Sequence, residues 1–165
     1  MDDVARAALR DLRKRMTRVC PDEVRACLEV LSDTEAWSRP NISSNSVGNL
    51  VVHLCGSTRH FIGMAIGGTG YRRNRPAEFA EKGPIPRVVL LRALDETVWE
   101  TDRVLESLTP ERLLDCTDAL PERFTFLELI LRISHHWALH TGQIVWATKA
   151  IKGPALAEHI KKTGG

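Results

Sequence analysis

Four long segments of this chain repeat their apolar residues every three to four positions, which is the spacing of one face of an α-helix. No segment of useful length alternates apolar and polar residues as a half-buried strand does. A chain of 165 residues can form one domain with a sizeable core and is short for two, so we expect a single domain over residues 1–165. The predicted fold is all-α, a four-helix bundle, with helices over residues 2–31, 45–66, 87–108 and 125–151.

Local signals set the ends of these helices. Pro21 removes a backbone donor inside the first segment, so we expect a kink or a break there. Ser44 or Asn45 suits the N-cap of the second helix, and Gly67-Gly68 suits its end. The connection to the third helix is about twenty residues long, which exceeds a simple hairpin loop and favours long crossover connections in an up-up-down-down arrangement. After the fourth helix, we expect the tail to hold one loose helical turn.

Composition and charge exclude some classes of function. The chain has 23 Lys and Arg against 21 Asp and Glu, and a net charge of +2 is too small to argue for a nucleic-acid partner. The longest run without charge, residues 40–58, is interrupted by Asn, Ser and His, so we expect no membrane partner. The acidic start lacks the apolar stretch of a signal peptide, which predicts a cytoplasmic protein with reduced thiols at Cys20, Cys27, Cys55 and Cys116.

Two histidines, His136 and His140, lie four residues apart in the fourth predicted helix. Positions i and i+4 share one helix face, so both imidazoles can reach one metal ion. A third histidine, His53, lies in the second predicted helix, and packing of the two helices would give three nitrogen ligands with an open fourth position, as in catalytic metal sites. His135 points away from His140. A single helical histidine is more often a hydrogen-bonded or surface residue, so this alternative stays open.

Polar residues also lie beside the apolar stripe of the second helix. Polar groups that face an interior must be hydrogen-bonded or bind something. His60 lies two turns after His53, roughly 10 Å along the axis, which is too far to share one ion. Cys55 lies on nearly the opposite side of the helix from His53. The candidates for the wall of a pocket around the metal site are Asn49, Ser57, His60 and Gln143.

Signatures of other catalytic classes are absent from the sequence. The chain has no H-E-x-x-H, no G-x-S-x-G elbow around Ser57, no P-loop and no G-x-G-x-x-G. The one local excess of positive charge is formed by Arg72, Arg73 and Arg75. These arginines are either a solvated loop or a contact for an anion beside the pocket.

The spaced motifs of the second and fourth helices resemble those of the DinB/YfiT-like superfamily. The first is Asn45-Ser-Val-Gly-Asn-Leu-Val-Val-His53-Leu, and the second is His136-x-x-x-His140-Thr-Gly-Gln-Ile144. Asn74-Arg75-Pro-Ala-Glu78-Phe79 is similar to a loop in one small uncharacterised branch of that superfamily. The resemblance covers about residues 2 to 151.

This resemblance implies a four-helix bundle, often dimeric, with a divalent metal on three histidines that map onto His53, His136 and His140. Members with assigned activity include bacillithiol S-transferases and a mycothiol-dependent maleylpyruvate isomerase, and others are described as metal-dependent hydrolases. It therefore implies a small-molecule substrate and a low-molecular-weight thiol as a second cofactor. We also expect a homodimer.

Two hypotheses of function follow from the sequence. The first is a metal-dependent enzyme, of the thiol S-transferase or hydrolase kind, in which the metal activates a thiol or water. The second is a non-catalytic metal-binding helical bundle that acts as a structural, regulatory or interaction module. Neutral imidazole suits zinc, nickel or iron. Each ligand histidine should donate its other ring nitrogen to an acceptor, for which Glu96, Glu100 and Glu128 are the candidates.

Overall fold

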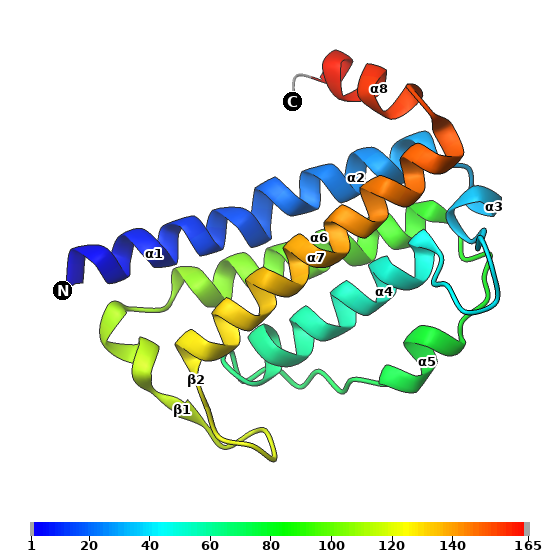
Figure 1. Cartoon of the computed structure of the whole chain (residues 1–165). Helices are drawn as coiled ribbons and strands as arrows, with labels where there is room; N and C mark the ends of the chain where they lie inside the picture. The colour runs from blue at the N-terminus through cyan, green and yellow to red at the C-terminus, as the bar shows by residue number, and fades with distance from the viewer. Residues whose placement is uncertain (1, 164–165) are drawn as a thin grey trace.

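The computed structural model describes residues 2–163 and is predominantly helical, as the periodicity predicts. Residues 1 and 164–165 of the predicted single domain lie outside the described residues. Four long helical segments pack along one another (Figure 1). They are α1 Asp2–Lys14 with η1 Arg15–Val19 and α2 Cys20–Val30, α4 Val47–Thr58 with η2 Arg59–Met64, α6 Arg87–Glu106, and α7 Phe126–Lys152. Among the described residues, no helix combines the length and apolar character that crossing a membrane requires.

Shorter elements join these segments. They are α3 Asp33–Ala36, α5 Arg75–Ala80, the 3₁₀ helix η3 Pro110–Leu114, and the antiparallel strands β1 Cys116–Thr117 and β2 Phe124–Thr125. The tail forms α8 Ala155–Thr163 rather than the single loose turn that we expected. Leu156 of α8 is fully buried in the core, and His159 Nε2 lies 2.7 Å from Glu29 Oε2 of α2, so tertiary packing holds this helix in place.

The irregularity expected at Pro21 lies just before it. The chain stays helical through Pro21, and residues 15–19 form a π-helical segment in which the Cys20 N–H donates to the Arg15 carbonyl. A proline ring clashes with the carbonyl four residues earlier, here that of Thr17. A wider π turn is a local adjustment that accommodates such a clash without ending the helix.

The long segments follow an up-down-down-up order. In Figure 1, α1–α2 and α7 run in one direction, and α4 and α6 run in the other. The crossover between η2 and α6, which carries α5, is present as predicted, but the up-up-down-down order is wrong. The physical reason is the connection after α2, in which α3 turns the chain so that α4 runs back along the molecule.

A capping box fixes the start of α4. Ser46, rather than Ser44 or Asn45, is the N-cap, and its hydroxyl accepts from the Asn49 N–H. The Asn49 side chain accepts in return from the Ser46 N–H, which completes a capping box. The positive φ of 66° at Gly68 follows the end of η2, as the Gly67-Gly68 pair predicts. The four cysteines are free, in agreement with the expectation of reduced thiols.

Candidate metal centre

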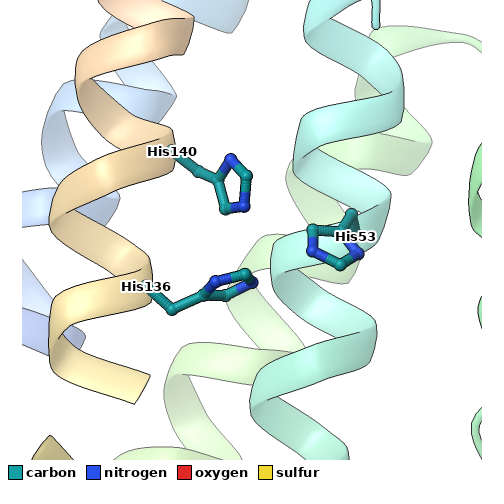
Figure 2. Close-up of side chains that lie close together, drawn as sticks. All are labelled: His53, His136 and His140. Carbon is teal, nitrogen blue, oxygen red and sulfur yellow. The ribbon is translucent and has the colours of Figure 1, made fainter. Parts of the chain in front are cut away.

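The three predicted histidines converge between two antiparallel helices. His53 comes from α4, and His136 and His140 lie one turn apart on α7 (Figure 2). One ligand atom from each ring lies within 4.8 Å of the other two. The ring centroids are 4.3 Å apart for His136 and His140, 4.9 Å for His53 and His136, and 5.1 Å for His53 and His140. The structure thus assembles the side-chain group that the sequence spacing predicted.

A buried carboxylate orients His53. The Nδ1 atom of His53 lies 2.8 Å from Oε2 of Glu78, and both side chains are more than nine-tenths buried. Arg73 donates from Nε to Oε1 of Glu78 at 2.7 Å and from Nη2 to Oε2 at 2.8 Å. This bidentate pair keeps Glu78 ionised and fixes the carboxylate as an acceptor. Donation of the Nδ1 proton to Glu78 leaves Nε2 of His53 as the free ligand atom.

The other two rings are arranged so that each can offer one nitrogen. His140 Nδ1 lies 2.7 Å from Oε1 of Gln143, one turn later on α7, and this bond leaves the second ring nitrogen of His140 free. His136 Nε2 is buried and has no hydrogen-bond partner among the described residues. A buried nitrogen without a partner is costly unless it binds something. The donor set of the cluster therefore fits a divalent cation.

Electrostatics keep at least two of these rings neutral. Burial, with smaller contributions from the neighbouring His140, His53 and Arg73, lowers the pKa of His136 to about 4. Burial also lowers the pKa of His53, although the Glu78 carboxylate opposes that shift. A metal binds the neutral form of imidazole, so both rings are ready to coordinate at neutral pH. Zinc, nickel and iron all accept such nitrogen ligands.

The acceptor of His53 is a correction to the sequence analysis, which named Glu96, Glu100 and Glu128. Glu96 and Glu100 lie 3.9 and 3.3 Å from Arg59, and Glu128 completes the capping box of α7 with Thr125. Glu78 was missed because it belongs to the connection between the second and third predicted helices. Asn74 followed by Pro76 and Glu78 carries the start signal of a helix, and that signal could have revealed α5.

The predicted pocket residues have different surroundings. Asn49 is fully buried, and its amide nitrogen donates to the carbonyls of Glu78 and Glu81, so it holds α5 against α4. Ser57 is buried one turn after His53. His60 Nδ1 is buried without a hydrogen-bond partner among the described residues, and its ring packs on Phe61. Gln143 alone of the four predicted pocket residues hydrogen-bonds a histidine of the cluster.

The three arginines of the connection have separate roles. The guanidinium of Arg73 is engaged by Glu78, and that of Arg75 lies 5.2 Å from the centroid of the Phe79 ring. Arg72 is exposed. Arg73 is thus engaged by a carboxylate, and an anion contact at Arg72 and Arg75 stays a prediction.

Comparison with known proteins relates this chain to a protein family. The sequence model of the DinB superfamily matches residues 16–144, which include all three histidines. The crystal structure of a DinB-like protein, YjoA, from Bacillus subtilis matches with a TM-score of 0.63 at 19% sequence identity, over 87% of this chain and 91% of that chain. At this identity the likeness shows the fold alone. No curated protein matches the sequence significantly.

Proposed function

The chain belongs to the DinB superfamily, and on that basis we propose that it is a metal-dependent enzyme in which a divalent cation activates a thiol or water. The observation that carries this proposal is the group formed by His53, His136 and His140. Three nitrogen donors leave at least one coordination position open, which is the arrangement of a catalytic rather than a structural metal site. The proposed reaction class is thiol S-transfer or hydrolysis of a small molecule.

The residues around the cluster would prepare it for this chemistry. A bound cation lowers the pKa of coordinated water or thiol and so supplies a nucleophile near neutral pH. Glu78 holds the ring of His53 through its Nδ1 atom, and Arg73 keeps Glu78 in place. Gln143 holds the ring of His140 in the same way, through Nδ1 of the histidine. This support fixes the ligand nitrogens before the cation binds, which reduces the cost of ordering them.

We further propose the finer architecture that accompanies this function. The four long segments form a four-helix bundle with one long crossover, and two copies form a homodimer. We propose zinc or nickel as the metal, with iron as the third candidate. Imidazole nitrogen suits all three metals. A low-molecular-weight thiol is the proposed second cofactor for an S-transferase.

Metal analysis of protein purified without a nickel column tests the site. We expect one divalent ion per chain in the wild type and loss of that ion in His53→Ala and His140→Ala. His135→Ala is the matched control, because His135 is exposed on the same helix outside the cluster, and it should retain the ion. Full occupancy in both ligand variants would show that the assignment of ligands is wrong.

Turnover separates the enzyme from the alternative, a non-catalytic module. The metal-loaded protein is incubated with low-molecular-weight thiols and a panel of electrophiles, esters and amides. Turnover that disappears in His140→Ala supports the enzyme. The alternative has its own support, because a cation held by α4 and α7 would crosslink two core helices. Metal-dependent stabilisation without turnover on any substrate would favour that module.

A further inference from the structure

A groove lies beside the histidine cluster, between the segment that leads into α4, the first half of α4 and the second half of α7. Its volume is ≈ 520 Å³, within the range typical of small-molecule sites. Apolar side chains form much of its wall, among them Leu50 of α4 and Leu139 and Trp146 of α7. Asn45 and Gln143 add polar groups to its lining. A largely apolar wall with a few polar groups is the usual composition of a ligand pocket.

The groove connects to the histidine cluster through Gln143. The same side chain that lines the groove accepts the hydrogen bond from His140 Nδ1, at 2.7 Å. Leu139, which also lines the groove, is the residue immediately before His140. A molecule in the groove would therefore lie next to a predicted metal ligand.

The apolar wall is exposed to solvent in the single chain. Trp146 is 69% exposed and Leu139 is 49% exposed. Large apolar groups that remain together at the surface mark sites of interaction. The volume of the groove and its mixed apolar and polar lining favour a small molecule as its occupant.

We propose that this groove binds an aromatic or similarly apolar part of the substrate and presents its reactive end to the histidine cluster. The inference rests on the proposed function and names the substrate class for that site, a small electrophile with an aromatic group. The indole of Trp146 offers a flat surface on which a ring can stack. Gln143 and Asn45 offer amide groups to polar substituents of the ligand.

A larger side chain at Gly142 should block the groove. It lines the groove, and a Cβ built there meets no atom within 4 Å. Gly142→Leu therefore fills the groove without disturbing the core, and it replaces glycine in a helix with a better helix former. Trp146→Ala removes the stacking surface. Trp99→Ala is the matched control, because Trp99 is 62% exposed on α6 and does not line the groove.

The test uses the metal-free protein and 4-nitrobenzyl alcohol, an unreactive aromatic probe, so that groove binding is measured apart from metal binding. Ligand-detected NMR gives the affinity, and spectra of ¹⁵N-labelled protein locate the site. We expect saturable binding with shifts at the Gly142 backbone and the Gln143 amide. Affinity should fall by about tenfold or more in Gly142→Leu and Trp146→Ala and stay unchanged in Trp99→Ala.

Three outcomes would overturn the inference. They are the absence of saturable binding to the wild type, equal affinity in Gly142→Leu, and conversion of a dimer to a monomer by Trp146→Ala, which would make the groove an interface between copies. Zinc affinity is measured separately on the same proteins and should be unchanged in Gly142→Leu. A wild type that binds the probe and no metal would refute the proposed function and leave the groove as an apolar binding site.

Discussion

The carboxylate of Glu78 joins parts of the site that are distant in the sequence. It accepts from His53 of α4 and from Arg73 of the crossover, and the backbone carbonyl of the same residue accepts from Asn49. A buried charge that loses its partner is far more costly than an exposed one. Glu78 is therefore the residue on which the orientation of His53 depends most directly.

Replacing Glu78 with Gln should weaken metal binding without removing a ligand. The neutral amide is a poorer acceptor for the Nδ1 proton of His53 and a poorer partner for Arg73. Loss of such an outer partner typically costs about 10–100-fold in metal affinity. Competition with a zinc-binding dye measures the effect. Glu96→Gln, which changes an acid that is paired with Arg59 instead, should retain the wild-type affinity, and a matching loss there would argue against a specific role for Glu78.

Gly56 makes the approach of Glu78 to α4 possible. A Cβ built at Gly56 would lie 2.3 Å from Oε1 of Glu78, far inside contact distance. Because Arg73 and His53 hold this carboxylate, Gly56→Ala should displace it and weaken zinc binding, although the substitution favours the helix. Gly142→Ala is the control, because its Cβ meets no atom within 4 Å, and it should gain about 0.5–1 kcal/mol in stability without losing affinity. Wild-type zinc affinity in Gly56→Ala would show that Glu78 can move without affecting His53.

At the scale of elements, Asn49 couples the start of α4 to α5. Its amide nitrogen donates to the carbonyls of Glu78 and Glu81 at 3.1 and 2.9 Å, and its oxygen accepts from Arg39 at 2.7 Å. The hydroxyl of Ser46, by comparison, bonds within the capping box, to the backbone and the side chain of Asn49.

Two substitutions separate this coupling from capping alone. Asn49→Ala leaves two carbonyls without their donor and should lower the free energy of unfolding by about 2–4 kcal/mol. Ser46→Ala should cost about 1 kcal/mol, the usual value for loss of an N-cap. Urea unfolding of both variants measures the difference. Equal losses would mean that the bonds to α5 add little to stability.

The sequence predicted the helices that carry the cluster better than the segments that support it. In α4 and α7, the apolar spacing determines which face is buried, and i, i+4 spacing places His136 above His140. These are local properties of one helix. The position of Glu78 depends instead on how the crossover folds back against α4. The glycines and prolines of residues 69–86 allow many conformations of this segment and do not determine which one forms. The same limit explains α8, since burial of Leu156 needs a surface that only the assembled helices provide.

At the scale of the whole molecule, one end is closed by contacts between segments distant in the sequence. Lys152, in the last turn of α7, pairs with Glu35 of α3 at 2.8 Å. Arg87, the first residue of α6, donates to the carbonyls of Glu29 and Leu31 at the end of α2. The end of α2 and the elements α3, α6 and α7 are thus tied together where the chain makes its first reversal.

The pH dependence of stability should report the Glu35 contact. Lys152, followed by the Ser32 backbone and hydroxyl, lowers the pKa of Glu35 to about 2. Because the folded state favours the ionised carboxylate, this stabilisation is complete above the unfolded pKa of about 4.3 and is lost as the pH falls towards 2. Glu35→Gln should therefore be less stable than the wild type in urea at pH 7, and the difference should shrink between about pH 4.5 and 2. Glu122→Gln, in the exposed turn between β1 and β2, should match the wild type throughout. A difference for Glu35→Gln that does not change with pH would show that the carboxylate acts through its shape rather than its charge.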